Sequence, residues 1–255
     1  MIRGAFTVGA WTMASRVLGF VRDILIAAVL GTGPVADAFF VALRLPNLFR
    51  RLFGEGAFNA AFVPAISTIL HKQGLRAATD FAEEATAVMA FWLGGITIIG
   101  EIFMPWLLYV LAPGFAGHGG RFDLAVGMSR VMFPYLFFIC LTALFSGVLN
   151  AMSRFAAAAA APVLFNLFMI AAMLWLAPYT RNPGYALAWG VTVSGIAQLV
   201  LVLWAIRRAG MRFTRPKLRF SPHIRQMFRR MAPALVGAGA VSYTHLRAHE
   251  TVLDL

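Results

Sequence analysis

Long apolar runs, each of about 20 residues or more, restrict how this chain can fold more than any other feature. The runs are continuous rather than alternating, so they predict helices and not the strands of a barrel. The chain has 255 residues, of which 60% are hydrophobic and 13% are charged. Soluble domains are typically about 45–50% apolar and about 25% charged, and they could not hide so much apolar surface. The sequence therefore predicts an all-α polytopic membrane protein, because a helix satisfies its own backbone amides in lipid.

Six complete spans and the start of a seventh are predicted, since a hydrocarbon core of about 30 Å needs about 20 helical residues per crossing. Their expected bounds are 4–30, 35–70, 85–111, 124–152, 156–176 and 185–206, with the seventh beginning near Pro233. The second run is too long for one straight crossing and contains Pro46, so we expect a bent or broken helix there. The chain is thus divided into a six-helix lobe (1–206), a basic linker (207–232) and the start of a seventh helix (233–241).

Basic residues, which give the chain a formal net charge of +12, gather in short segments between the apolar runs. The linker after the sixth span is densely basic, whereas the loops on the opposite side hold only Arg121 and Arg181. The positive-inside rule therefore places the linker and the N-terminus in the cytoplasm. This distribution suits a topology signal better than nucleic-acid binding, and contact with anionic lipids is the alternative role for the linker.

The final segment, 242–255, turns polar just after the seventh span has begun. It reads SYTHLRAHETVLDL and resembles translated sequencing-library adapter, so we expect a non-native tail. His245 and His249, spaced four residues apart and followed by Glu250, imitate a helical zinc pair. We expect no metal site there.

Charged residues inside the first two predicted spans are the candidates for function. Arg16, Arg22 and Asp23 lie in the first span, and Asp37, Arg44, Arg50, Arg51 and Glu55 lie in the second. One Arg or Asp at a helix centre costs roughly 2.5–3.5 kcal/mol on insertion scales, so these side chains must face protein, water or one another. Asp37, Arg44 and Arg51 recur every seven residues and so share one helix face.

A cavity lined by these arginines would take an anionic substrate. A guanidinium presents a planar set of donors that matches phosphate oxygens, and it stays ionised at low dielectric. Asp23 and Asp37 would hold the guanidinium groups in position, or pair with them when no substrate is bound. The alternatives are packed ion pairs, or side chains that reach from helix ends to the membrane interface. Pro46 frees a backbone carbonyl, either to line the cavity or only to kink the helix for packing.

The residues that carry these charges also carry a family resemblance. The strings SRVLGFVRD (15–23) and ADAFFVALRLPNLFRRLFGEGAFNAAFVP (36–64) resemble the MviN/MurJ-type lipid II flippases of bacteria. The strings APGF (112–115), FPYLFF (133–138) and LNAMSRFAAAAAAP (149–162) do so as well. The resemblance extends from residue 1 to about residue 241. It implies the multidrug/oligosaccharidyl-lipid/polysaccharide exporter fold, in which two six-helix lobes surround a central cavity.

By this resemblance, Arg16, Arg22 and Arg50 are the cavity arginines needed for flipping, and Asp37 is the matching acidic residue. Arg44 and Arg51 join them as substrate-binding candidates because of their position in the second span. The resemblance implies alternating access, with lipid II carried from the inner to the outer leaflet of the bacterial cytoplasmic membrane, coupled to ions or membrane potential. This chain would be the N-terminal lobe alone, without the C-terminal lobe and its own cavity arginine.

Two other functions stay open on the sequence. The first is export of another polyprenyl-linked glycan or of a drug by a member of the same superfamily. The second is a membrane enzyme acting on polyprenyl phosphates, which would need a general acid–base pair or a metal set, and neither is evident. We therefore expect a transporter that is not an enzyme and has no cofactor, with lipid II and membrane lipids as partners and no nucleic acid.

Overall fold

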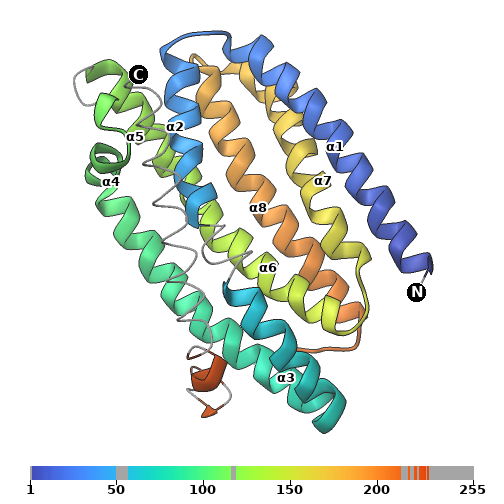
Figure 1. Ribbon diagram of the computed structural model, residues 1–255. Helices are drawn as coiled ribbons and strands as arrows, with labels where there is room; N and C mark the ends of the chain where they lie inside the picture. Colours follow the sequence, from blue (N-terminus) through green and yellow to red (C-terminus); the bar gives the residue numbers. More distant parts are fainter. Residues whose placement is uncertain are drawn as a thin grey trace, which may run out of the picture.

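The computed structural model describes residues 2–49, 57–115, 119–213, 218, 221–222, 224–227 and 229. In these residues, long helices lie side by side (Figure 1). They are α1 (Ile2–Leu30), α2 (Pro34–Phe49), α3 (Ala57–Ile102), α4 (Met104–Leu111), α5 (Gly119–Met132), α6 (Tyr135–Ala151), α7 (Ala156–Ala171) and α8 (Pro183–Arg208). A π-helical turn, Ala172–Leu176, extends α7, and short 3-10 turns lie at Pro113–Phe115 and Ala177–Tyr179. The all-α prediction is confirmed over the described residues.

Four helical stretches in the described part of the chain are long and apolar enough to cross a membrane. They are Ala60–Ile102, Gly120–Ala151, Ala156–Tyr179 and Pro183–Arg208. The large side chains Phe91, Ile98 and Trp106 on α3 and α4 are exposed on this lobe, as expected of a surface that faces lipid. The prediction of a multi-pass helical membrane protein is confirmed, and the count of six spans stays a prediction.

The region between the second and third predicted spans differs from expectation. A connecting segment was expected over 71–84, but α3 is helical through this region except at Gly74, where φ is 84° and ψ is −178°. The two arms of α3 double back on each other at the lower right of Figure 1, and Gly74 is the non-helical residue between them. The second arm of α3 is helical from its start because Ala78, Phe81 and Ala85 form a buried stripe at helical spacing. The second arm of α3 therefore begins before residue 85, and the start of the third membrane span at that residue stays a prediction.

Two predicted spans are interrupted where proline removes a backbone donor. The third span breaks at Phe103, between α3 and α4, and Pro105 lies in the first turn of α4. The fourth span begins earlier than predicted, at Gly119, and breaks between Met132 and Tyr135, where Pro134 is the N-cap of α6. The predicted spans 85–111 and 124–152 therefore each contain a break between two helices.

The other helix boundaries carry local capping residues. Gly31 closes α1 with φ of 61°, in the left-handed region that suits a C-terminal glycine, and Pro34 begins α2. Asn182 caps α8, with its side-chain oxygen accepting from the backbone N–H of Gly184 at 3.0 Å. The first, fifth and sixth predicted spans agree with α1, with α7 and its π-helical extension, and with α8.

α8 lies between α6 and α7 and packs on both (Figure 1). Fully buried apolar residues such as Leu136, Leu144 and Val191 fill this central part of the lobe. α1 packs mainly on α7 and lies at one edge of the lobe, whereas α2 packs mainly on α5. The two helices with the candidate charges are therefore each held by one principal neighbour, which leaves part of each helix exposed on this lobe.

Candidate functional site

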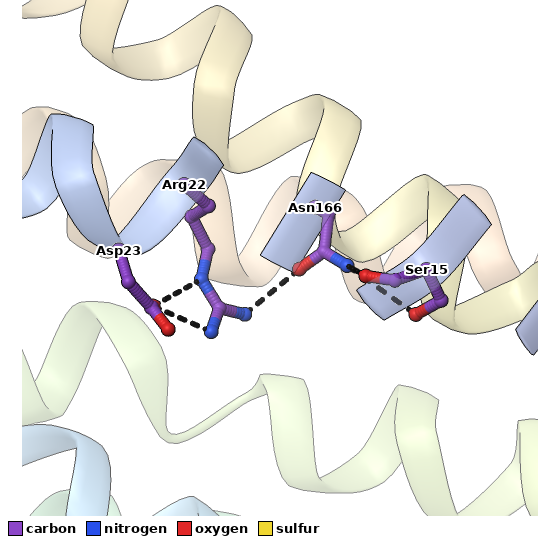
Figure 2. A network of polar contacts seen from close by, with 4 residues as sticks. All are labelled: Ser15, Arg22, Asp23 and Asn166. Carbon is purple, nitrogen blue, oxygen red and sulfur yellow. Dashed lines mark hydrogen bonds and ion pairs between the residues drawn. The ribbon is translucent and has the colours of Figure 1, made fainter. Parts of the chain in front are cut away.

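Arg22 is the centre of a polar network between α1 and α7 (Figure 2). Its Nε and Nη2 donate to Oδ1 of Asp23 at 3.0 and 2.7 Å. Its Nη1 donates to Oδ1 of Asn166 at 2.8 Å. The guanidinium carbon also lies 5.4 Å from the centroid of the Phe165 ring, within reach of a cation–π contact. The guanidinium is thus held by its own helix on one side and by α7 on the other.

Asn166 is the residue of α7 that completes this network. Its Oδ1 accepts from Arg22, and its Nδ2 donates to the backbone oxygen of Ser15 at 2.9 Å and lies 3.4 Å from the Ser15 hydroxyl (Figure 2). Ser15 and Arg22 are seven residues apart, about two helical turns, and so lie on the same face of α1. One side-chain amide therefore joins α7 to two points along α1.

Arg22 keeps donors for a ligand in this arrangement. A guanidinium has five N–H donors, and among the residues that the structure describes the contacts with Asp23 and Asn166 use three of them. The side chain of Arg22 is 24% exposed and that of Asp23 is 65% exposed, so the ion pair lies at the open face of α1. The remaining donors can bind an oxyanion such as a phosphate, to which arginine binds with well-defined geometry.

The other described arginines of the predicted site do not join this network. Arg16, six residues before Arg22 on α1, is exposed, and so is Arg44 on α2. Six helical steps place Arg16 and Arg22 about 9 Å apart along the helix axis and about 120° apart around it. The two side chains therefore leave α1 in different directions, and a ligand that binds both would have to be wide.

Asp37 pairs with Arg121, which was predicted to lie in a loop on the side of the membrane opposite the basic linker. Its Oδ2 lies 3.7 Å from Nη1 of Arg121, and both side chains are about half exposed. The packing of α2 on α5 brings the pair together, since Asp37 is in the first turn of α2 and Arg121 is near the start of α5. Asp23 thus holds an arginine as expected, whereas the described partner of Asp37 is not one of the predicted site arginines.

Two of the predicted site residues, Arg50 and Arg51, lie outside the described residues, as does Glu55. Their assignment to the substrate site stays a prediction. The same holds for the seventh span from Pro233 and for the tail, 242–255, with its two histidines.

A pocket of about 440 Å³ lies at the bend between α3 and α4 and is lined by Ile99, Gly100, Phe103, Trp106 and Leu107. Its lining is almost wholly apolar, and none of the predicted site residues belongs to it. It therefore has no groups that would bind an anion, and the charged residues of α1 and α2 are the better candidates for a substrate site.

Sequence reasoning missed Asn166, although a signal was present. Asn166 is a lone amide inside the apolar run 162–173, and a polar side chain in a membrane span usually faces a partner within the protein. The site residues predicted from the sequence are all charged, and this uncharged side chain is not among them. Its contact with Arg22 spans 144 positions of sequence, and helical periodicity carries no information over such a distance.

Comparison with known proteins identifies the family. The model of the family described as "Lipid II flippase MurJ" matches residues 26–246. The "Probable lipid II flippase MurJ" of Rhizobium tropici is 44% identical over 243 residues, covering 94% of this chain and 46% of the relative. The "Lipid II flippase MurJ" of Burkholderia cenocepacia is 42% identical over 211 residues, covering 83% of this chain and 41% of the relative. The chain thus spans a little under half the length of these relatives.

A solved structure shares the fold. The structure of a "Lipid II flippase MurJ, inward closed conformation" superposes with a TM-score of 0.71 at 24% sequence identity, covering 91% of this chain and 47% of that one. Because the identity is low, this likeness concerns the fold alone. It relates the helices described above to one half of a longer transporter.

Proposed function

Because the chain belongs to the lipid II flippase MurJ family, we propose that its full-length protein moves lipid II from the inner to the outer leaflet of the bacterial cytoplasmic membrane. The observation that carries the proposal is the setting of Arg22. Asp23 and Asn166 hold its guanidinium on an open face of α1, and contacts within the described residues leave two of its N–H donors unused. A fixed guanidinium of this kind suits the pyrophosphate of a lipid-linked headgroup, because phosphate oxygens accept charge-assisted hydrogen bonds.

The proposed binding site consists of Arg16, Arg22 and Arg50, with Arg44, Arg51 and Asp37 as further contributors. Together they would supply more positive than negative charge, which favours an anionic headgroup over a cationic drug. The lipid tail would stay in the bilayer while the headgroup occupies the cavity. Arginine is suited to this role because it remains ionised in a low-dielectric environment, where lysine can lose its proton.

The chain forms the N-terminal lobe of the proposed transporter, with residues 1–206 as its six spans. Residues 207–232 would connect this lobe through the cytoplasm to a seventh helix that starts over 233–241, and the tail 242–255 would be non-native. A second lobe would close the cavity. Transport would follow alternating access, in which the lobes rock about the bound headgroup and no covalent bond is made or broken.

Depletion of the full-length protein in its bacterium, followed by measurement of lipid II at the outer leaflet, tests the proposal. Outer-leaflet lipid II is expected to fall and to be restored by the wild-type gene but not by Arg22→Ala. Arg181→Ala is the matched control, since it removes an exposed arginine from the turn before α8 and should restore transport. Unchanged outer-leaflet lipid II after depletion would contradict the proposal.

A further inference from the structure

We infer that Asn166 is a positioning residue for Arg22, and that its side-chain amide sets the direction in which the guanidinium meets the headgroup. This inference rests on the proposed function. Asn166 would not itself touch the substrate. It would act through Arg22 by holding Nη1 while Asp23 holds the opposite edge.

The burial of Asn166 shows that its amide is specifically accommodated. The residue is 4% exposed, in a helix whose other buried members, such as Val163 and Met169, are apolar. A buried amide without partners is costly, and this amide has partners at both ends. All of these partners lie on α1, so the amide binds specifically to that helix.

The chemistry of the neighbours fixes which end of the amide faces which group. The guanidinium of Arg22 can only donate, so it must face the amide oxygen, and the carbonyl of Ser15 can only accept, so it must face the amide nitrogen. A flipped amide would set donor against donor at one end and acceptor against acceptor at the other. Asparagine supplies a donor and an acceptor side by side, and leucine and aspartate, which have similar sizes, do not.

Gly19 gives the amide its access to α1. It lies between Ser15 and Arg22 at the i+4 position of the same face, and a Cβ on it would be 3.7 Å from Nδ2 of Asn166. The side chain of Asn166 therefore lies over Gly19 and reaches the polar groups one turn to either side. A large side chain at position 19 would displace the amide of Asn166.

The consequence for binding follows from the geometry of Arg22. Asp23 alone would hold the guanidinium only from its own helix, through a carboxylate that is itself 65% exposed. With Asn166 in place, the contacts are made on two sides, and the remaining donors point in a fixed direction. Preorganisation of this kind raises affinity because less side-chain freedom is lost when the ligand binds.

The test is a double-variant cycle on the full-length protein in lipid nanodiscs, titrated with lipid II. Asn166→Leu is expected to weaken binding by up to about tenfold, because the less restrained guanidinium of Arg22 must then be ordered when the ligand binds. Added to Arg22→Ala, the same change should weaken binding no further, because Asn166 acts only through that arginine. Asn166→Ala, which makes a smaller change in packing, is run in parallel in case the leucine variant fails to fold.

Thr192→Val is the matched control. Thr192 is also buried, and its hydroxyl donates to the backbone oxygen of Val131, so this hydrogen bond joins α8 to α5 rather than to α1. Loss of the Thr192 hydroxyl should lower the melting temperature but leave the affinity for lipid II unchanged. A purely structural role for Asn166 predicts that the two variants behave alike.

Two results would overturn the inference: wild-type affinity in Asn166→Leu and Asn166→Ala, or losses that multiply when either change is combined with Arg22→Ala. Failure of the proposed function is distinguished by titrating the same variants with inorganic pyrophosphate. Wild-type protein that binds pyrophosphate but not lipid II contradicts lipid II as the substrate, and the cycle with pyrophosphate then decides the role of Asn166. Wild-type protein that binds neither overturns both.

Discussion

The ring of Phe62 stacks on that of Phe81, with centroids 5.6 Å apart and an interplanar angle of 15°. On one straight helix, residues so far apart in sequence would lie about 28 Å from each other, at 1.5 Å per residue. The contact is made because the chain reverses at Gly74, whose φ of 84° and ψ of −178° suit glycine almost alone. The two arms of α3 thus pack on each other through their aromatic side chains.

Gly74→Ala is therefore expected to destabilise the lobe by about 1–3 kcal/mol, the usual cost of forcing a side chain into this backbone region. The measurement is the thermal melting of the purified protein in detergent. Gly95→Ala, in the second arm of the same helix, is the control, because a Cβ there meets nothing within 4 Å. Equal melting temperatures for Gly74→Ala and the wild type would show that the reversal does not depend on glycine.

The close approach of α8 to α7 gives a second prediction. A Cβ on Gly190 would lie 2.8 Å from the Cβ of Ala172, which is in the π-helical turn and has no flexible side chain to move away. Gly190→Ala should therefore force the helices apart and cost about 1–3 kcal/mol, as overpacking usually does. Melting in detergent measures this, with Gly94→Ala as a control that has open space. Equal stability of Gly190→Ala and the control would mean that the two helices can separate freely.

Asp37 and Arg121 provide a third prediction. Their charged atoms are 3.7 Å apart and about half exposed, so loss of this pair should change stability by less than about 1 kcal/mol. In a complementation assay, Asp37→Asn is expected to reduce lipid II transport, because Asp37 is assigned to the substrate site, whereas Arg121→Gln should stay near wild type. Equal losses in both variants, with recovery when the two charges are exchanged, would assign the role of Asp37 to its pairing with Arg121.

The orientation of the chain gives a fourth prediction. Cys140 is the single cysteine and is fully buried, so Cys140→Ser provides a cysteine-free background. Arg76 and Arg181 are both exposed, and the predicted topology places them on opposite sides of the membrane. If the N-terminus is cytoplasmic, a membrane-impermeant maleimide added to whole cells should label Arg181→Cys and not Arg76→Cys. The reverse labelling pattern would invert the topology, and permeabilised cells, in which both positions should react, provide the control.

The sequence by itself determined that this chain is a bundle of membrane helices with arginines in its first two predicted spans. These conclusions depend on local properties, since apolar run length and helical period are set within about 20 residues. The ends of α1 and α8 were predictable for the same reason, because Gly31, Pro34 and Asn182 act on their immediate neighbours. The candidates Arg16 and Arg22 were also found this way, from the cost of placing charge in lipid.

The tertiary structure decided which residues meet. Helical propensity could not reveal that the chain reverses at Gly74 rather than over a longer loop, because the second arm of α3 gains its stability by burying Phe81 against Phe62. Helical propensity also could not reveal that the side-chain amide of Asn166 bonds both Arg22 and Ser15. Those contacts depend on how α7 packs against α1. Packing brings together side chains from distant parts of the sequence, and hydrophobic periodicity specifies only the face that each helix presents.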